Sequence, residues 1–500
     1  MGKSLMVQGT ASDSGKSILV AGLCRIFHQD GLKVIPFKSQ NMALNSYITL
    51  TGEEMGRAQV FQAEAAGVVP DVRMNPVLLK PTSDHKSQVI FQGKVLSDMD
   101  AVEYHDFKPQ LIEKISTLYQ ELLAENDVIV LEGAGSPAEI NLNDKDIANM
   151  GMAKIADAPV ILVADIDKGG VFASIYGTVH LLAPEERARI KGIVINKFRG
   201  DIALLEPGLR MIEELTNIPV VGVVPYAQLN IEDEDSVALN RVNRLYNTQK
   251  ELDIAIVALS KISNFTDFNS LSIEPDVSVR YVFPGDQLES PDLVILPGSK
   301  NTLEDCLYLE RSGLAEEIQR VRNEGKVIFG ICGGFQLLGK QLYDPKQIES
   351  AHGSMPGLGL LTTETYFEAE KTTTQVTAKI GQEEITGYEI HMGRTENYEE
   401  QFFAEIIEAN GKPCKKLDGA VSSDGKVLGT YLHGVFDNSK WRRDLLNQIR
   451  QSKGLPPIET VAVPYQEYKN QQYDKLAELL RGHLDMEKIY QIINFEELET

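Results

Sequence analysis

Short apolar runs recur along the first half of the chain, separated by helical patterns or long polar connections. Runs without polar alternation are typical of strands that are buried on both faces of a parallel sheet. Their alternation with helical patterns predicts a doubly wound α/β fold. The predicted strands are residues 4–8, 33–37, 127–131, 159–164, 192–196 and 220–224.

A second alternation of the same kind begins beyond residue 250. The polar segment 228–250 is acidic at first and then basic, and we interpret it as the junction between two domains. The predicted strands of the second domain are residues 253–259, 278–283, 292–296 and 326–331. We therefore expect an α/β domain over residues 1–230, a linker over 231–251, a second α/β domain over 252–445 and a helical tail over 446–500.

The first predicted strand leads into a loop of small residues, Gly9-Thr10-Ala11-Ser12-Asp13-Ser14-Gly15-Lys16-Ser17, and then into an apolar helix. A P-loop needs small residues so that backbone N–H groups can wrap phosphate, a Lys for the β- and γ-phosphates, and a Ser or Thr for Mg²⁺. The strict pattern has Gly where Thr10 stands, so this loop is a variant. The flanking strand and helix favour a nucleotide site over a chance Gly-Lys-Ser. The predicted contacts are Gly9, Thr10, Ser12, Gly15, Lys16 and Ser17.

Further polar residues end predicted strands at the same edge of the sheet. Glu132 closes the third strand at the carboxyl edge, where ligands bind in such sheets. It is a candidate Mg²⁺ ligand together with Ser17, and a solvated strand-end acid is the alternative. Asn196 and Lys197 end another strand, where they either contact the base or phosphates of a nucleotide or form a surface turn.

Two long polar segments, residues 38–46 and 70–93, interrupt the first domain. Each is either an ordinary loop or a functional one, since long loops inside a compact domain are often functional. The formal net charge of −23 would repel an anionic substrate, so such a substrate needs a locally basic pocket. Lys38, Lys80 and Lys86 would supply it, and the candidate substrate contacts are Lys38, Gln40, Asn41 and Lys80.

The second domain contains a glycine-flanked cysteine, Gly330-Ile331-Cys332-Gly333-Gly334, between an apolar run and a helical pattern. Strand, sharp turn and helix around G-x-C-x-G are typical of a nucleophile elbow. The following helix would favour the reactive thiolate. The alternative is a buried Cys in a glycine-rich turn.

A catalytic Cys also needs an oxyanion site and a base. The predicted strand 292–296 ends in Pro297-Gly298-Ser299, and the N–H groups of Gly298 and Gly333 are candidate oxyanion donors. The base must be distant in sequence but close in the fold. The segments 387–391 and 429–433 both look like strands that end in a His, and the sequence alone does not choose between His391 and His433.

Composition narrows the class of protein. The net charge of −23 argues against nucleic acid and anionic membranes as partners. No apolar run approaches the ~18 residues of a membrane helix, and the N-terminus leads into a strand without a signal-peptide region. The four cysteines are scattered and form no CxxC pair, which suits a reducing compartment. We expect a cytoplasmic protein with more than one domain.

Seven stretches of the sequence resemble the cobyric acid synthase family, and the resemblance covers nearly the whole chain. They are G-T-x-S-x-x-G-K-S at 9–17, F-K-S-Q-N-M-A-L-N at 37–45, M-N-P-V-L-L-K-P at 74–81, L-E-G-A-G-S-P-A-E-I-N-L at 131–142, G-I-C-G-G-F-Q-L-L-G at 330–339, Y-E-I-H-M-G at 388–393 and G-T-Y-L-H-G-V-F at 429–436. The N-terminal half is similar, more loosely, to dethiobiotin synthetase and cobyrinic acid a,c-diamide synthase.

The resemblance implies a P-loop NTPase-like domain followed by a class I glutamine amidotransferase-like domain. It also implies a reaction, the ATP- and glutamine-dependent amidation of the b, d, e and g carboxylates of adenosylcobyrinic acid a,c-diamide to give adenosylcobyric acid. Cys332 would be the nucleophile and His433, rather than His391, its base. By analogy with dethiobiotin synthetase, Glu54 would be a second Mg²⁺ ligand beside Glu132.

One position departs from the usual class of glutamine amidotransferases. That class has a Glu two residues after the His, where this chain has Val435, and Asp437 is an alternative carboxylate that could orient His433. The missing Glu predicts a less firmly held imidazole and slow glutamine hydrolysis without the other substrates.

Two other functions stay open. The chain could be an a,c-diamide synthase or another ATP-dependent glutamine amidotransferase. A P-loop scaffold ATPase is more remote, because it needs a second Lys early in the loop, where residues 10–14 have none. That function would also leave Cys332 and His433 without a role.

Overall fold

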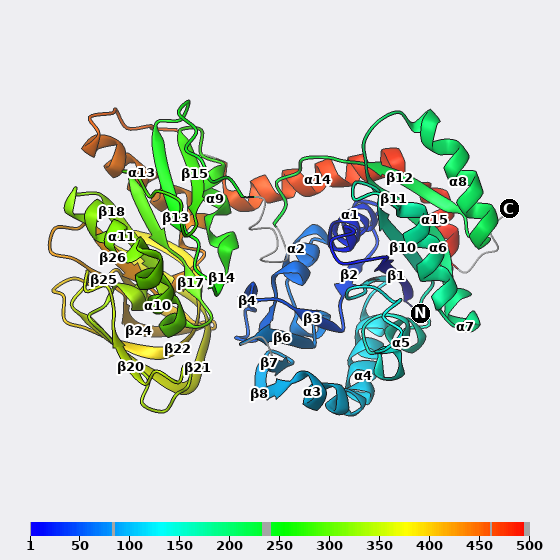
Figure 1. Ribbon diagram of the computed structural model, residues 1–500, viewed down its shortest axis with the longest axis horizontal. Helices are drawn as coiled ribbons and strands as arrows, with labels where there is room; N and C mark the ends of the chain where they lie inside the picture. Colours follow the sequence, from blue (N-terminus) through cyan, green and yellow to red (C-terminus); the bar gives the residue numbers. More distant parts are fainter. Residues whose placement is uncertain (1, 83–85, 233–241, 461–462, 495–500) are drawn as a thin grey trace. The chain divides into compact units, whose positions relative to one another are not determined.

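The computed structural model describes residues 2–82, 86–232, 242–460 and 463–494, which fall into two compact units (Figure 1). Unit 1 comprises Met1–Met42, Met55–Glu232 and Lys469–Thr500, and unit 2 comprises Ala43–Glu54 and Asp233–Tyr468. This division differs from the expected domain boundaries in two places, the short segment 43–54 and the C-terminal helices. Part of the expected linker, 233–241, and the end of the expected tail, 495–500, lie outside the described residues.

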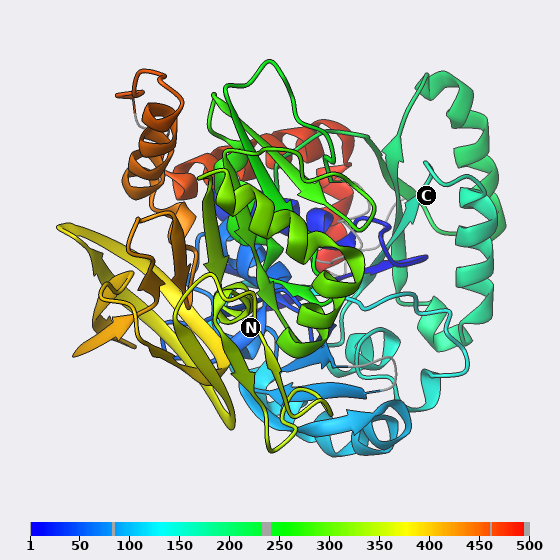
Figure 2. The ribbon, with the colours of Figure 1, turned by 60° about the vertical axis from the view of Figure 1, so that its left-hand side comes forward.

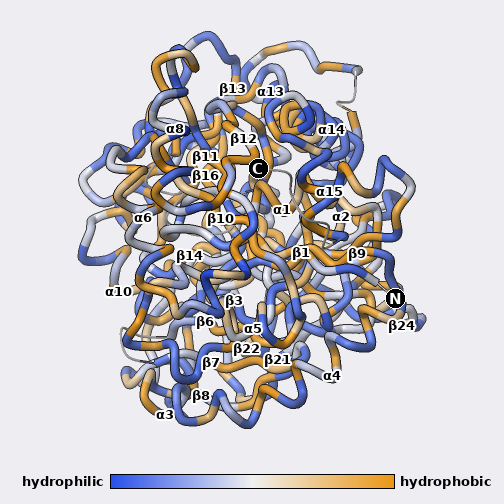
Figure 3. The backbone as a smooth tube through the Cα atoms, turned by 90° about the vertical axis from the view of Figure 1, so that its right-hand side faces the viewer, coloured by the Kyte–Doolittle hydropathy of each residue, from blue (hydrophilic) through white to orange (hydrophobic). Residues whose placement is uncertain are grey.

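Unit 1 is built on a six-stranded parallel sheet in the order β12-β11-β10-β1-β9-β2. All six predicted strands are present, and Figure 3 shows apolar residues along those that it labels, such as β1 and β10. β1 lies between β9 and β10, so the chain changes direction in the sheet beside the predicted P-loop, where ligands bind in doubly wound sheets. The strands are β1 (Lys3–Gly9), β2 (Val34–Phe37), β9 (Val128–Glu132), β10 (Val160–Asp165), β11 (Ile190–Phe198) and β12 (Val220–Pro225).

The helices of unit 1 connect and cover these strands. One face of the sheet, which includes Leu5 and Val7, packs against α1, α2, α14 and α15 in a single apolar cluster. The C-terminal helices therefore complete the core of unit 1 and do not form a separate tail. The helices are α1 (Lys16–Gln29), α2 (Arg57–Ala65), α3 (Ala101–Phe107), α4 (Pro109–Glu125), α5 (Met150–Ile155), α6 (Val171–Leu181), α7 (Pro184–Arg187), α8 (Ile202–Thr216), α14 (Tyr465–His483) and α15 (Met486–Asn494).

A smaller sheet of unit 1 has the strand order β3-β6-β7-β8. Part of the segment 70–93, interpreted from the sequence as a loop, forms two of its strands, β6 and β7. Polar and apolar residues alternate only weakly in these segments. The strands are therefore stabilised mainly by their hydrogen-bonded pairing with neighbouring strands. The strands are β3 (Gln40–Met42), β6 (Val77–Pro81), β7 (Lys86–Phe91) and β8 (Lys94–Asp100).

Unit 2 contains a second largely parallel sheet, in the order β15-β13-β16-β18-β26-β25, where β25 is antiparallel. The four strands predicted from the sequence are the first four of this order. They are β13 (Leu252–Val257), β15 (Val277–Val282), β16 (Leu293–Leu296) and β18 (Val327–Ile331), followed by β25 (Ala420–Val421) and β26 (Val427–Thr430). The helices are α9 (Asn269–Ser272), α10 (Thr302–Ser312), α11 (Leu314–Asn323), α12 (Gly333–Leu338) and α13 (Ser439–Ser452).

A mixed seven-stranded sheet, not predicted from the sequence, forms the rest of unit 2. Its long β21–β22 hairpin is drawn in yellow in Figure 2. The interpretation of His391 as a strand-end residue is wrong, because β22 continues past it to Asn397. The strands are β19 (Gln341–Tyr343), β20 (Ser354–Pro356), β21 (Thr363–Ile380), β22 (Glu383–Asn397), β23 (Ala404–Ala409), β24 (Lys412–Asp418) and β27 (Leu432–His433).

The segment 43–54 belongs to unit 2, although the chain on either side of it belongs to unit 1. It contains β4 (Ser46–Ile48), which pairs with β5 (Glu54–Gly56). Ile48 packs with Tyr388 and Ile390 in a small buried cluster. Among the helices of the described residues, none has both the length and the apolar character that crossing a bilayer requires.

Candidate active sites

The predicted P-loop joins β1 to α1 as a tight turn. Gly15 has φ 96°, and a Cβ there would lie 2.1 Å from Asn196 Nδ2. At Gly9, a Cβ would lie 2.2 Å from Ser14 Oγ. The positive φ of Gly15 favours glycine there, and a Cβ at Gly9 would displace the Ser14 side chain. The loop leads directly into the N-terminus of α1, and helix N-termini of this kind are typical phosphate-binding sites.

Asn196 and Lys197 brace this loop from the end of β11. Asn196 Nδ2 donates a hydrogen bond to the carbonyl oxygen of Ser14 at 2.9 Å. Lys197, at φ 62°, donates from Nζ to the carbonyl oxygen of Asp13 at 2.5 Å and pairs with Asp165 at 2.8 Å. The sequence left open whether these residues contact a nucleotide or form a surface turn, and the structure shows both of them bound to the P-loop backbone.

Lys16 and Ser17 begin α1 and face the carboxyl edge of the sheet. Lys16 is buried, and its Nζ donates to the carbonyl oxygens of Ala11 at 3.0 Å and Gly135 at 3.1 Å. Ser17 Oγ donates to Glu132 Oε1 at 2.9 Å. The parallel register of β1 and β9 places Val7 opposite Glu132, which brings the acid to the start of the loop.

Glu132 is the centre of a buried polar cluster. Besides Ser17, its carboxylate accepts from Lys38 Nζ at 2.9 Å and from Gln62 Nε2 at 2.6 Å. Lys38 supplies the countercharge that a buried carboxylate requires. The cluster therefore gathers one acid, one ammonium group and one hydroxyl beside the loop.

The oxygens of Ser17 and Glu132 fit a magnesium site at a nucleotide. Mg²⁺ at such sites is typically held by one or two protein oxygens, substrate phosphates and water. The described residues hold no cluster of three or more His, Cys, Asp or Glu side chains suited to a metal. The pair therefore suits Mg²⁺ that arrives with a phosphate ligand.

Whereas Glu132 belongs to unit 1, Glu54, the second expected Mg²⁺ ligand, belongs to unit 2. Its carboxylate is buried in unit 2 and pairs with Lys371 Nζ at 2.5 Å. Glu54 is thus a buried carboxylate paired with a lysine, as Glu132 is with Lys38, and its role as a Mg²⁺ ligand stays a prediction from the resemblance.

The remaining candidate substrate residues lie on or beside the small sheet of unit 1. Gln40 and Asn41 are on β3, and Lys80 is buried on β6, which pairs with β3. Gln40 Oε1 accepts from Tyr104 Oη at 2.7 Å, and Asn41 Nδ2 donates to Gln59 Oε1 at 3.0 Å. These residues therefore share one sheet with one another and are already hydrogen-bonded within it or to its neighbours.

An apolar pocket of about 130 Å³ lies beside the P-loop. Gly15, Asn196 and Lys197 form the part nearest the loop, and Pro225 and Tyr226 follow β12. Leu476, Leu479 and Leu480 of α14 also line the pocket. Sequence reasoning missed these leucines, because nothing in the helical pattern of the tail indicates which domain it joins.

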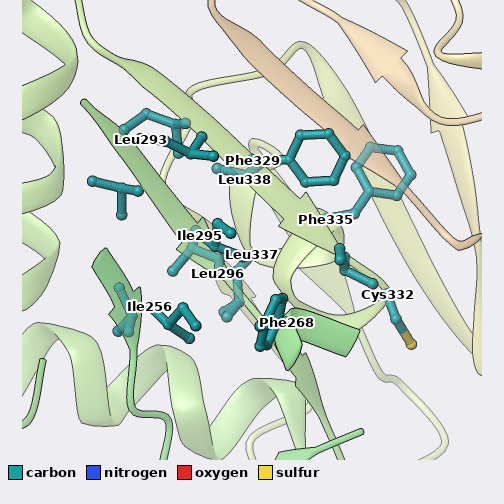
Figure 4. Close-up of a cluster of buried hydrophobic side chains, with 14 of the residues drawn as sticks. Ile256, Phe268, Leu293, Ile295, Leu296, Phe329, Cys332, Phe335, Leu337 and Leu338 are labelled. Carbon is teal, nitrogen blue, oxygen red and sulfur yellow. The ribbon is translucent and has the colours of Figure 1, made fainter. Parts of the chain in front are cut away.

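Cys332 occupies the sharp turn that the sequence predicts between β18 and α12. Its φ of 52° and ψ of −110° lie in a region that L-residues rarely adopt. A Cβ at Gly334 would lie 1.9 Å from the carbonyl oxygen of Leu296, so this glycine is required for the close approach of β16. In Figure 4 the Cys332 sulfur points away from the apolar cluster around Phe329 and Leu337. Its Sγ lies 3.4 Å from the carbonyl oxygen of Ile390.

His433 is buried at the end of β27 and is held on two sides. Its Nδ1 lies 2.6 Å from Asp267 Oδ2. The ring of Tyr388 stacks on the imidazole, with centroids 5.2 Å apart. Its Nε2 has no hydrogen-bond partner among the residues that the structure describes.

The two candidate oxyanion donors lie beside these groups. A Cβ at Gly298 would lie 3.1 Å from His433 Cε1, and one at Gly333 would lie 2.8 Å from the backbone N of Ser299. Gly298 and Ser299 form β17, which pairs with β14 (Ile262–Ser263). The two-stranded ribbon thus brings the Pro-Gly-Ser turn to the elbow and to the His433 ring.

The electrostatic environment of His433 favours its charged form. Burial lowers the pKa of His433, but the charge of Asp267 and its hydrogen bond, with a further contribution from Cys332, raise it to about 10. An imidazolium at this position stabilises a neighbouring thiolate.

His391, the other candidate base, has different neighbours. Its ring stacks on Tyr431 with centroids 3.7 Å apart, and Nδ1 lies 2.9 Å from the carbonyl oxygen of Gly393. It lines a polar cavity of about 300 Å³ together with Arg394 and Asp418. Neither ring nitrogen is held by a carboxylate within hydrogen-bond distance, since Glu389 Oε1 lies 3.6 Å from Nε2.

Three residues of this site escaped the sequence analysis. Asp267 lies in a short 3-10 turn, η4 (Phe265–Phe268), with no motif around it. Tyr388 lies on β22 in the stretch Y-E-I-H-M-G, and the sequence does not indicate that its ring contacts His433. Gln336, on α12, bonds to Tyr431 Oη at 3.2 Å. Sequence spacing could not indicate these contacts, because each depends on how distant strands pair.

Comparison with known proteins matches the whole chain. Residues 5–237 match the family model described as CobQ/CobB/MinD/ParA nucleotide binding domain, and residues 253–441 match the CobB/CobQ-like glutamine amidotransferase domain. The cobyric acid synthase of Streptococcus sanguinis is 65% identical over 99% of this chain and 100% of its own. The cobyric acid synthases of Limosilactobacillus reuteri and Listeria innocua are 60% and 59% identical, and each covers at least 98% of both chains.

Proposed function

The chain belongs to the cobyric acid synthase family, and from this we propose that it amidates corrinoid carboxylates in cobalamin biosynthesis, with ATP and glutamine as co-substrates. The observation that carries the proposal is the 65% identity to a cobyric acid synthase over the full length of both chains. The substrate is adenosylcobyrinic acid a,c-diamide, whose b, d, e and g carboxylates become amides in adenosylcobyric acid.

The chemistry requires two sites. A carboxylate is a poor electrophile and does not react with ammonia at neutral pH. Free ammonia is mostly protonated at that pH, and ammonium is not a nucleophile. Transfer of the γ-phosphoryl group of ATP to the carboxylate gives an acyl phosphate with a good leaving group, and hydrolysis of glutamine supplies neutral ammonia where it is needed.

Unit 1 supplies the phosphoryl-transfer site. The P-loop backbone holds the phosphates, and Lys16 and Lys38 stabilise the negative charge that spreads over the transferred group. Ser17 and Glu132 would hold Mg²⁺, which offsets phosphate charge when it is bound. If Glu132 held the metal, the ammonium group of Lys38 would be available to the phosphoryl oxygens or the substrate carboxylate.

The apolar pocket beside Gly15 is the site we assign to the adenine base. It adjoins the P-loop that holds the phosphates, and its walls from β12 and α14 offer apolar contact to the faces of a purine. In this assignment the C-terminal helix serves the nucleotide site, a role that the position of α14 in the core of unit 1 supports.

Unit 2 supplies the glutaminase site. The Cys332 thiolate attacks the side-chain amide carbon of glutamine, and the oxyanion that forms accepts hydrogen bonds from backbone N–H groups at Gly298 and Gly333. His433 gives its Nε2 proton to the departing ammonia, which leaves a γ-glutamyl thioester. His433 then takes a proton from water as that water attacks the thioester, and glutamate leaves with the thiolate restored.

The substrate carboxylates are negatively charged, and the protein is acidic, so their binding requires local positive charge. Lys38 and Lys80 supply positive charge at the small sheet of unit 1, and Gln40 and Asn41 supply amide groups beside them. We assign these four residues to the corrinoid site, where they would orient peripheral carboxylates toward the phosphoryl donor.

Mass spectrometry of the corrinoid product tests the function. Incubation of the a,c-diamide with ATP, Mg²⁺ and glutamine is expected to convert four carboxylates to amides. Incubation with cobyrinic acid itself is the control, and it is expected to give no a,c-diamide. Conversion of cobyrinic acid but not of the a,c-diamide would overturn the proposal in favour of an a,c-diamide synthase.

A further inference from the structure

Asp267 supplies the carboxylate that the motif around His433 lacks. Its Oδ2 lies 2.6 Å from His433 Nδ1, and its Oδ1 accepts a hydrogen bond from the backbone N–H of Gly434 at 3.2 Å. We propose that Asp267 is the positioning residue of the glutaminase site, and that it holds the imidazole of His433 so that Nε2 serves Cys332. This inference rests on the proposed function of unit 2 as a glutaminase.

The position of Asp267 follows from the β14–β17 ribbon. β14 ends at Ser263, Asn264 turns the chain with φ 53°, and Asp267 follows in η4. The partner strand β17 contains Gly298, where a Cβ would lie 3.1 Å from Cε1 of the same ring, between its two nitrogens. One local structure therefore places both the carboxylate and a candidate oxyanion donor around His433.

The second contact to the imidazole depends on the same turn. Asn264 Nδ2 donates to Tyr388 Oη at 2.7 Å, and the Tyr388 ring stacks on His433 at an interplanar angle of 18°. Asp267 thus holds the edge of the ring, and Asn264, through Tyr388, supports its face. A ring fixed at both its edge and its face has little freedom to turn its Nε2 away.

The carboxylate of Asp267 interacts with the imidazole ring of His433. Asp267 is 5% exposed, and among the described residues its one partner within ion-pair distance is His433. A buried carboxylate is costly unless it is paired, so the pair is stable mainly as carboxylate and imidazolium. Because Asp267 accepts a hydrogen bond from Nδ1–H of His433, that proton stays on Nδ1. Nε2 is then the atom that exchanges a proton with the sulfur and with ammonia.

The position two residues after His433 cannot take this role, because Val435 is a buried apolar residue. The carboxylate comes instead from a segment that precedes Cys332 in the chain. The order along the sequence is therefore Asp, Cys, His, and no pattern near His433 reveals it. Asp437, the carboxylate nearest to His433 in sequence, is the natural control.

The first test compares Asp267→Asn with Asp437→Asn in the full-length protein. Asp267→Asn keeps the shape but removes the charge, and we expect kcat for glutamine-dependent amidation to fall at least about 100-fold, with KM for glutamine nearly unchanged. Amidation with ammonium chloride should stay at the wild-type rate, which also reports a folded synthetase unit. Asp437→Asn should change neither rate by more than a factor of about two. Loss in Asp437→Asn and not in Asp267→Asn would overturn the proposal.

A second measurement separates positioning from a merely structural role. In a His433→Ala background, Asp267→Asn should cause no further loss of glutamine hydrolysis, because Asp267 acts through the imidazole. Partial recovery in Asp267→Glu is expected as well. A further fall of 10-fold or more in the double variant would show that Asp267 only supports the fold.

A third measurement does not depend on the overall reaction. The rate of Cys332 alkylation by iodoacetamide, followed by peptide mass spectrometry, reports the thiolate fraction at each pH. Without the Asp267 charge the imidazolium is less stable, so the pH of half-maximal rate should rise in Asp267→Asn and stay unchanged in Asp437→Asn. An identical profile in wild type and Asp267→Asn would contradict the proposal even if the enzyme acted on another acceptor.

Discussion

The ring of Tyr388 lies nearly parallel to the imidazole of His433, with 18° between their planes and 5.2 Å between their centroids. Tyr388 belongs to β22 and His433 to β27, and the two residues are paired in the antiparallel ladder that joins these strands. The stacking therefore follows from the register of the sheet. Tyr388 contacts the face of the His433 imidazole, and Asp267 contacts the edge of the same ring.

This relationship predicts different effects for two substitutions of Tyr388. Tyr388→Phe keeps the stacked ring, so we expect kcat for glutamine hydrolysis to stay within about fivefold of wild type. Tyr388→Ala removes the ring, and we expect a fall of at least about 10-fold because the imidazole gains freedom. Steady-state glutaminase assays check both values. Equal losses in the two variants would assign the role to the hydroxyl group and not to the ring.

The P-loop lysine should matter to both nitrogen sources. Lys16→Ala removes the ammonium group that would face the phosphates, and we expect glutamine-dependent and ammonium-dependent amidation to fall together by at least about 100-fold. Lys191→Ala, at an exposed position on β11 of the same unit, is the matched control and should be silent. Full amidation by the Lys16→Ala protein would remove the P-loop from the mechanism.

The assignment of the adenine site to the pocket beside α14 can be tested at Leu479, which is partly exposed. Leu479→Asp places an unpaired charge against the base, and we expect KM for ATP to rise at least about 10-fold. Glutamine hydrolysis without ATP should not change. Glu478→Gln, at the exposed neighbouring position, serves as control. An unchanged KM for ATP in Leu479→Asp would place the base elsewhere.

A buried acid in unit 2 should make stability depend on pH. Burial, with the charge of Glu389 as a second cause, raises the pKa of Asp418 to about 7. The unfolded value is about 3.9, so the folded state binds the proton more tightly, and the stability this contributes is present below about pH 4 and is lost as the pH rises to about 7.

Asp418→Asn removes the loss of stability that wild type shows as the pH rises, because Asn does not titrate. The melting temperature of the variant relative to wild type should therefore be higher at pH 8 than at pH 5, as differential scanning fluorimetry would measure. Asp424→Asn, at a half-exposed position in the same unit, provides the comparison. A difference between Asp418→Asn and wild type that does not change with pH would mean that Asp418 stays charged in the folded protein.

The six strands of the unit 1 sheet and four strands of the unit 2 sheet could be predicted from the sequence, because buried parallel strands are continuous apolar runs. β1 and β18 are examples, and the loops after them contain Lys16 and Cys332, whose Gly-rich flanks indicate sharp turns. Those signals are local, and they suffice to place each candidate residue at the carboxyl edge of its sheet.

The features that escaped prediction depend on contacts between distant segments. The β21–β22 hairpin mixes polar and apolar residues on both faces, so its period is weak. The apolar face of α15 does not indicate which core it joins. Asp267 and Glu54 are single acids without a motif, and only the folded chain shows that one binds His433 and the other binds Lys371.

The central claim is that one unit releases ammonia and the other makes a carboxylate receptive to it. The most direct measurement is the mass of the corrinoid product formed by the Cys332→Ser protein with ATP and either glutamine or ammonium chloride. We expect no amidation with glutamine and wild-type amidation with ammonium chloride, because Cys332 acts only in the release of ammonia. Loss of amidation with both nitrogen sources, or its retention with both, would contradict this division of labour.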